Sequence, residues 1–146
     1  MSIKQTNYEL IKDCALRLKY LKDFYYTTNI FILNKEDAYN LAHIIEWISG
    51  ISTTIKENRI CFTNCKNIIN IWYSNGLRNV GRWSRSNLMI IDKGIILEDI
   101  IEIFAPMNNL QPCLGIYYYD IKDYNYFVRQ LNDDPDKEKF PGVALL

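Results

Sequence analysis

Segment 75–87 gathers the residues of this sequence whose types best suit the recognition of an anion. It reads NGLRNVGRWSRSN and places three arginines around a tryptophan, at Arg78, Arg82, Trp83 and Arg85. A guanidinium group binds a phosphate or carboxylate through two parallel hydrogen bonds, and an aromatic ring can stack on a nucleobase. The segment therefore predicts a surface for an acidic protein face or a nucleic acid. The alternative is a solvated loop whose arginines pair with the acidic last third of the chain.

The single histidine, His43, is the main candidate for acid–base chemistry. A catalytic base needs a nucleophile within reach. The residues that would supply one are Cys61, Cys65, Ser84 and Ser86, and no sequence context selects among them. Trp47 follows one helical turn later, on the polar side of the same predicted helix. Because tryptophan is enriched at interface hot spots, we interpret His43 and Trp47 as partner contacts. The alternative is that a loop or the C-terminal tail covers Trp47.

The segment GIYYYDIKDYNYF, at 115–127, is rich in tyrosine. In a strand, side chains alternate between faces, so Tyr118 points away from the side shared by Tyr117 and Tyr119. Tyrosine offers a large amphipathic surface at low entropic cost, which suits protein recognition. We therefore include Tyr118 among the predicted partner contacts, with a half-exposed sheet face as the alternative.

Metal and cofactor chemistry is not predicted. The four cysteines (14, 61, 65 and 113) are irregularly spaced, and with one histidine a four-ligand metal site would have to use nearly every soft ligand in the chain. We expect reduced thiols instead. The acidic cluster at 133–138 lacks the spacing of a calcium loop. No cofactor-binding signature is present in the sequence.

Charge is balanced overall, with 17 basic and 17 acidic residues. Its distribution is uneven, because the middle of the chain is basic and the last third is acidic. A neutral chain does not favour nucleic acid or a membrane surface as its partner. No apolar run approaches the length of a membrane span, and segment 1–10 lacks the apolar core of a signal peptide. We therefore expect a cytoplasmic protein.

Two helices are predicted in the first third. A capping box at 6–9 begins a helix over 7–24, with an apolar stripe at Leu10, Cys14, Leu18, Leu21 and Tyr25. A second helix is predicted to begin at Asn34 and to end before Gly50. A last helix, capped by Asp120 or Asp123, follows the tyrosine-rich segment.

Strands are predicted at 27–33, 58–64, 67–74 and 113–120. Segment 88–97 predicts a hairpin around Asp-Lys-Gly, and 97–104 suits either a helix or a strand. This order of helices and strands along the chain predicts one α+β domain over 1–146. The domain has a mainly antiparallel sheet of four to six strands, two N-terminal helices and one C-terminal helix. Residues 133–146 form either a tail or an arm that docks through its apolar residues Phe140, Val143, Leu145 and Leu146.

The functional hypothesis is a small non-catalytic binding protein that occupies or inhibits a macromolecular partner. Abundant isoleucine, asparagine and tyrosine indicate AT-rich coding, which is typical of low-GC bacteria, phages and mobile elements. An immunity protein or a phage or mobile-element accessory protein fits this description. We expect a protein partner first, a nucleic acid bound by Arg78, Arg82 and Arg85 second, and no membrane partner. A small transferase- or nuclease-type enzyme is the third hypothesis.

Overall fold

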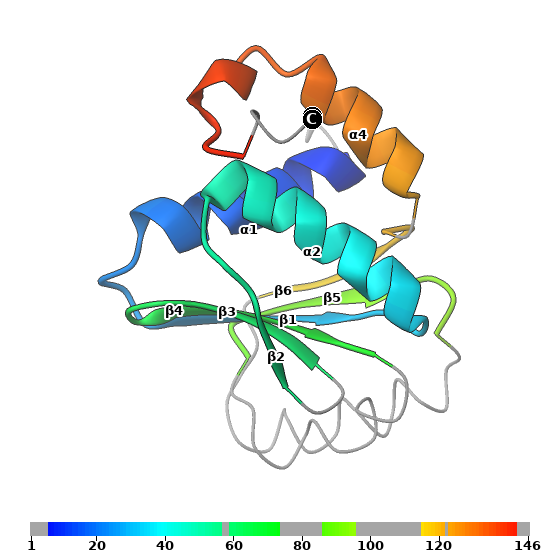
Figure 1. Ribbon diagram of the computed structural model, residues 1–146. Coiled ribbons are helices and arrows are strands. Elements are labelled where there is room, and N and C mark those ends of the chain that lie inside the picture. Colours follow the sequence, from blue (N-terminus) through cyan, green and yellow to red (C-terminus); the bar gives the residue numbers. More distant parts are fainter. Residues whose placement is uncertain (1–5, 57–58, 74–85, 96–114, 122, 143–146) are drawn as a thin grey trace, which may run out of the picture.

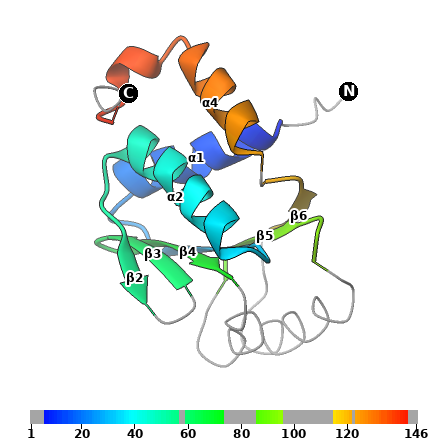
Figure 2. The same cartoon turned by 45° about the vertical axis from the view of Figure 1, so that its right-hand side comes forward.

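In the computed structural model, the three helices of the described residues lie on the same side of a six-stranded mixed sheet (Figure 1). The structure describes residues 6–56, 59–73, 86–95, 115–121 and 123–142. The elements are α1 (Asn7–Tyr20), β1 (Tyr26–Phe31), α2 (Lys35–Ser49), β2 (Thr54–Lys56), β3 (Arg59–Asn64), β4 (Asn67–Trp72), β5 (Leu88–Asp92), β6 (Gly115–Tyr119), α4 (Tyr124–Asn132) and the 3-10 turn η3 (Lys137–Lys139). Turning the molecule leaves α1, α2 and α4 on the same side of the sheet (Figure 2). The predicted α+β class and the positions of its helices are confirmed.

The strand order is β2-β3-β4-β1-β5-β6, so the first strand of the chain lies inside the sheet. β1 pairs in parallel with both β4 and β5, and β6 pairs in parallel with β5. Only the β2-β3 and β3-β4 pairings are antiparallel. The expectation of a mainly antiparallel sheet is therefore corrected, because three of these five pairings are parallel. For β1 and β4 the physical reason is that α2 returns the chain to the end of the sheet where β1 begins, so that after the β2-β3 reversal β4 runs parallel to β1.

The hairpin predicted over 88–97 is also corrected. β5 ends at Asp92 and has β1 on one side and β6 on the other. Both edges of β5 are therefore occupied, and a strand after Gly94 has no place beside it. The Asp-Lys-Gly turn is real, since the Asp92 carboxylate accepts a hydrogen bond from the Gly94 N–H at 3.0 Å. It ends a buried strand instead of joining two strands of a hairpin.

α1 begins as predicted, because the Thr6 hydroxyl accepts a hydrogen bond from the Glu9 N–H at 3.1 Å. It ends at Tyr20, four residues before the predicted end. The side-chain amides of Asn64 and Asn67, on the β3–β4 hairpin, donate to backbone carbonyls in the last turn of α1. The Asn64 amide thereby supplies a donor for the Leu18 carbonyl, one of the last carbonyls of the helix. The predicted stripe positions Leu21 and Tyr25 therefore lie outside the helix.

α2 has both of its predicted ends. The Asn34 side chain accepts a hydrogen bond from the Glu36 N–H at 2.8 Å, and Gly50 takes the left-handed conformation with φ of 72°. A glycine adopts this conformation without a steric penalty. α4 begins likewise at Asp123, whose carboxylate accepts from the Tyr126 N–H at 3.0 Å.

The main core lies between the helices and the sheet. The helix-facing strand residues that it buries include Ile30, Ile60, Phe62, Ile69, Ile71 and Ile90. The opposite face of the central strands is also buried, and there the Asn29 side-chain oxygen accepts hydrogen bonds from the Asn70 amide and the Trp72 indole. Within the described residues no helix combines the length and the apolar character that crossing a membrane requires.

Candidate partner-binding surface

The four predicted contacts of the arginine-rich segment, Arg78, Arg82, Trp83 and Arg85, lie outside the described residues. Tyr118 is in β6, in register with Ile91 of β5. Its side chain is likewise outside the described part of the structure. The arginine surface and the contact role of Tyr118 therefore remain predictions.

Trp47 is buried, with 6% of its surface exposed, and it packs under the C-terminal segment. The Gly142 N–H donates to the Trp47 carbonyl oxygen at 3.1 Å. Phe140 is buried in the same core. The C-terminal segment therefore covers Trp47, as the alternative prediction for this residue states. The same segment docks on the core through Phe140. Its other predicted anchors (Val143, Leu145 and Leu146) lie outside the described residues.

His43 is exposed on α2 and lines a shallow pocket of about 70 Å³ with Tyr39, Ala42, Glu46, Thr53 and Ile60. Of its candidate nucleophiles, Cys61 and Ser86 are buried, and the Ser86 hydroxyl donates to the Leu88 carbonyl oxygen at 3.0 Å. Cys65 lies in the β3–β4 turn, and Ser84 lies outside the described residues. The described geometry gives His43 no nucleophile among these cysteines and serines.

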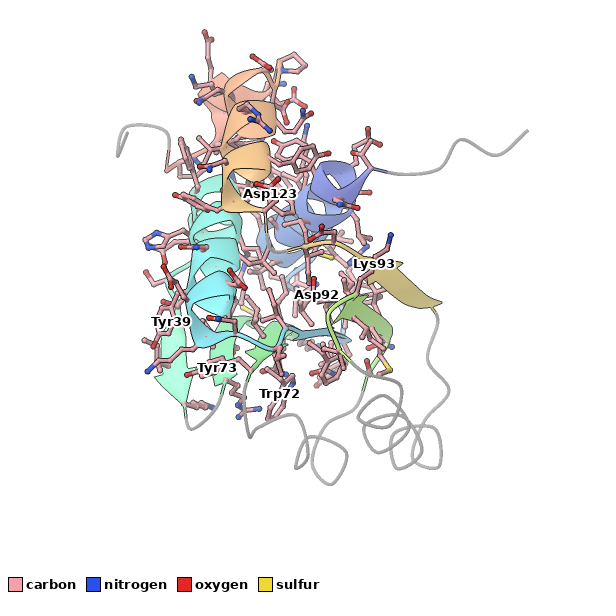
Figure 3. The ribbon with its side chains drawn as sticks, turned by 90° about the vertical axis from the view of Figure 1, so that its right-hand side faces the viewer. Tyr39, Trp72, Tyr73, Asp92, Lys93 and Asp123 are labelled. Atoms are coloured by element: carbon pink, nitrogen blue, oxygen red, sulfur yellow. The ribbon has the colours of Figure 1, made fainter. Side chains whose placement is uncertain are left out.

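The carboxyl edge of the parallel strands is the usual ligand site of open α/β sheets (Figure 3). Here its charged groups hold the fold together. The Asp92 carboxylate accepts hydrogen bonds from the backbone N–H groups of Gly94 and Ile121. Asp123 caps α4. Tyr39 lies beside Tyr73, and burial, followed by the charge and hydrogen bond of Tyr39, raises the pKa of Tyr73.

Exposed apolar side chains gather on the turn between α1 and β1. Six large hydrophobic residues are exposed in the described part of the chain, and four of them lie in this turn or at the end of α1 next to it. We call these four residues the α1–β1 surface, with the exposed fraction of each side chain given in parentheses: Tyr20 (64%), Leu21 (43%), Phe24 (66%) and Tyr25 (81%). The early end of α1 creates this surface, because it removes Leu21 and Tyr25 from the helical stripe.

Cations surround the α1–β1 surface. The Lys66 Nζ atom lies 4.8 Å from the centroid of the Tyr25 ring, and the Lys19 Nζ atom lies 5.0 Å from that of Tyr20. Both distances suit cation–π attraction. Lys22 is exposed in the turn itself, beside Asp23. The surface therefore combines apolar area with a positive rim.

The turn is held against the β3–β4 hairpin by its backbone. The Lys66 N–H donates to the Lys22 carbonyl oxygen at 2.8 Å, and the Tyr26 N–H donates back to the Lys66 carbonyl oxygen at 3.3 Å. Within the turn, the Phe24 N–H donates to the Leu21 carbonyl oxygen at 3.1 Å. These bonds fix the backbone that carries the exposed rings, so the surface is preorganised.

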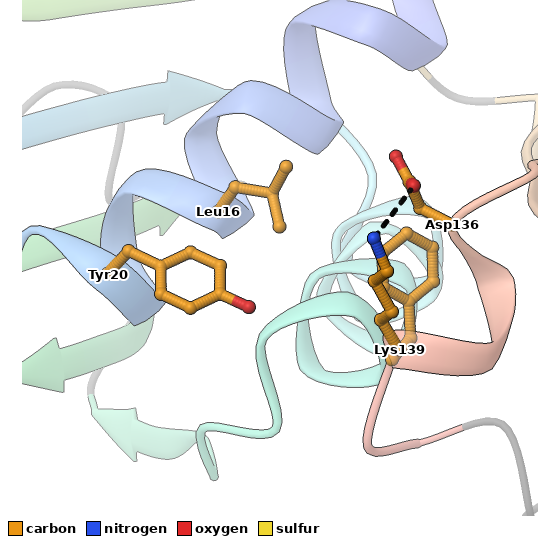
Figure 4. Close-up of a pocket in the computed structure, with 5 residues that line it drawn as sticks. Leu16, Tyr20, Asp136 and Lys139 are labelled. Carbon is orange, nitrogen blue, oxygen red and sulfur yellow. Dashed lines mark ion pairs between the residues drawn. The ribbon is translucent and has the colours of Figure 1, made fainter.

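A groove of about 200 Å³ adjoins this surface, between α1 and the segment that contains η3 (Figure 4). Its walls are Leu16 and Tyr20 from α1, and Asp136, Lys139 and Phe140 from the C-terminal segment. Tyr20 belongs to both the groove and the α1–β1 surface. The two features are therefore one continuous region.

No protein-family model, curated protein or solved structure matches this chain. In the described residues, no three His, Cys, Asp or Glu side chains are grouped to hold a metal ion. The α1–β1 surface is the strongest candidate site, and the helical pattern concealed it. Its sequence signal is the dense aromatic and basic run KYLKDFYY, at 19–26.

Proposed function

We propose that this protein acts by binding a macromolecular partner, most simply another protein, through the α1–β1 surface. In this role it occupies or inhibits its partner without chemical catalysis, as an immunity protein or a phage-type inhibitor does. The observation that carries the proposal is the exposure of three aromatic rings, Tyr20, Phe24 and Tyr25, on one hydrogen-bonded turn.

The exposed apolar area supports this proposal, because removing it from water on binding would be favourable. Full burial of a large apolar side chain contributes roughly 1.5–3 kcal/mol. Aromatic residues dominate interface hot spots, and a positive rim adds selectivity for an acidic partner. The turn backbone is already ordered by its bonds to Lys66, so little backbone conformational entropy is lost when a partner binds.

A nucleic-acid-binding module is the second candidate, acting through Arg78, Arg82 and Arg85. Lysines and aromatic rings on the α1–β1 surface also suit a single strand. The apolar side chains Leu21 and Phe24 favour a protein instead, because nucleic acid offers little aliphatic surface to cover them. A lysine also lies over the ring of Tyr20 and another over that of Tyr25. On each of these two rings, a lysine thus occupies one of the faces on which a nucleobase could stack.

The test is co-purification from the native host with a tagged protein. A Phe24→Ser/Tyr25→Ser double variant should lose its stoichiometric protein partner by about 30-fold or more in affinity, the size of a 2 kcal/mol hot spot. The matched control is Leu33→Ser/Ile55→Ser, which replaces two apolar residues of similar exposure elsewhere. Circular dichroism should show that both variants remain folded.

Two results would overturn the proposal. In the first, partner capture is unchanged by the Phe24/Tyr25 double variant. In the second, the captured species is a nucleic acid, removed by nuclease and lost steeply as salt rises. The second result would favour nucleic-acid binding through the arginine segment. An Arg78→Ala/Arg82→Ala/Arg85→Ala variant would then test that function.

A further inference from the structure

The groove beside the α1–β1 surface has an apolar floor and a charged rim. Leu16 of α1 and Phe140 of the C-terminal segment line it, together with Tyr20 at the end of α1 (Figure 4). Its volume is about 200 Å³. A protein cavity of ~150 Å³ holds a benzene molecule. The groove is therefore large enough for one aromatic or branched side chain.

The two charged residues at the rim are not equivalent. The Lys12 Nζ atom lies 3.1 Å from the Asp136 carboxylate and 2.8 Å from the buried Asp134 carboxylate. Asp136 thus shares with Asp134 one close cation that is fixed in place. Lys139 lies farther from Asp136, at 3.7 Å, and its side chain is 77% exposed. An incoming carboxylate can draw Lys139 away at little cost, because such exposed pairs contribute little to stability.

Positive charge gathers on the surface next to the groove. Tyr20 connects the groove to Lys19, whose Nζ atom lies over the Tyr20 ring. Lys22 and Lys66 follow along the turn, where Asp23 is the acidic residue beside them. A chain that crosses from the groove to Tyr25 meets more cations than anions. Charge complementarity therefore selects an acidic occupant.

We propose that the groove receives one apolar side chain from an acidic segment of the partner protein, with an adjacent carboxylate paired to Lys139. This inference rests on the proposed function and names the chemistry of the partner. The apolar side chain covers Leu16 and Phe140, and the rest of the segment runs over Tyr20 onto the α1–β1 surface.

Two small probes of matched shape test the groove without the partner. 3-Phenylpropanoate and 3-phenylpropylamine carry the same ring with opposite charges. In a titration of the full chain followed by amide NMR, 3-phenylpropanoate should shift the signals of Leu16, Tyr20 and Phe140 in a saturable manner. It should bind about threefold more tightly than the amine, the effect of one exposed ion pair.

Charge reversal supplies the control. Lys139→Glu should reverse the preference, so that the amine binds more tightly than the carboxylate. Lys93→Glu makes the same change at an exposed lysine on the turn after β5, and it should leave the preference unchanged. Both lysines are exposed, so neither variant should unfold the chain.

The proposal is overturned if neither probe shifts the groove signals, or if Lys139→Glu does not change the preference. Either result leaves the proposed function standing, provided that the Phe24/Tyr25 double variant still loses its partner. If the probes bind as expected but no protein is captured through Phe24 and Tyr25, the proposed function fails. The assignment of the groove to a partner segment then fails with it.

Discussion

Gly142 donates its backbone N–H to the carbonyl oxygen of Trp47 at 3.1 Å, which joins the C-terminal segment to α2. A Cβ atom on Gly142 would lie 2.5 Å from the Trp47 Cα atom and 2.8 Å from its Cδ1 atom. The same crossing is tight on its other side, where a Cβ atom on Gly50 would meet the Pro141 ring at 2.8 Å. Two glycines therefore let the arm lie flat on the helix.

Gly142→Ala should lower the free energy of unfolding by about 1–3 kcal/mol, because the added methyl group overpacks the contact with Trp47. Chemical denaturation measures the change. Lys139→Ala, in the same segment but exposed, should stay within ~0.5 kcal/mol of the wild type. Equal stability of the Gly142→Ala protein and the wild type would mean that the arm does not pack on Trp47.

Asp134 makes stability depend on acid pH. Burial acts to raise the pKa of its carboxyl, but hydrogen bonds from Lys12, from Tyr8 and from the Asp136 N–H outweigh it and hold this pKa below the ordinary value of 3.8. A carboxyl with a depressed folded-state pKa stabilises the fold above its unfolded pKa. That contribution is lost as pH falls through the folded-state pKa.

Asp134→Asn should therefore lower the free energy of unfolding at pH 7 by about 1.5–3 kcal/mol, the range for a hydrogen bond to a charged group. It should also flatten the fall in stability below pH ~4. Denaturant titrations at a series of pH values measure both effects. Asp133→Asn, at the exposed neighbour, is the matched control. Parallel pH curves for wild type and Asp134→Asn would contradict this role.

Cys14 and Cys65 should differ strongly in reactivity. Burial raises the pKa of the Cys14 thiol to about 11, and the nearby Arg17 offsets only part of this effect. Because the thiolate is the reactive form, Cys14 should resist iodoacetamide until the protein unfolds. Cys65 is exposed in the β3–β4 turn and should react in the native protein. Peptide mass mapping, with and without denaturant, measures the two rates separately, and equal native rates would contradict the burial of Cys14.

Asn29 should be the most sensitive polar residue on the sheet face opposite the helices. Its side-chain oxygen accepts hydrogen bonds from the Trp72 indole at 2.9 Å and from the Asn70 amide at 3.2 Å. Asn29→Ala would leave two buried donors without an acceptor, and each should lower the free energy of unfolding by about 1–3 kcal/mol. Asn70→Ala breaks only one of these two bonds and should cost less in thermal denaturation. The reverse ranking would show that Asn29 does not organise this face.

Local chemistry made the helix starts predictable from sequence. Thr6, Asn34 and Asp123 each accept a hydrogen bond from a backbone N–H within three residues, so a short window holds the whole signal. The end of α1 was not predictable in this way. Its last turn is hydrogen-bonded by the side chains of Asn64 and Asn67, from a hairpin that a local pattern does not connect to α1.

The same limit hid the α1–β1 surface. Helical spacing placed Leu21 and Tyr25 on the buried stripe, whereas the chain leaves the helix at Tyr20 and exposes both residues. The predicted contacts His43 and Trp47 do share α2, but only His43 is exposed, because the distant C-terminal arm covers Trp47. In the first case long-range contacts coincide with the early end of the helix, and in the second they decide which residues of a correctly predicted helix face water.

The central position of β1 has a consequence for the order in which the chain is made. Thr28 of β1 pairs with Ile69 on one side and with Leu88 on the other, and both partners are synthesised later. β1 therefore leaves the ribosome with both of its edges unpaired. Such edges promote aggregation, and distant pairing slows folding. A nascent chain released before Leu88 should be recovered in inclusion bodies or bound to chaperones. The sheet can then form correctly only late in translation, after β5 has been synthesised.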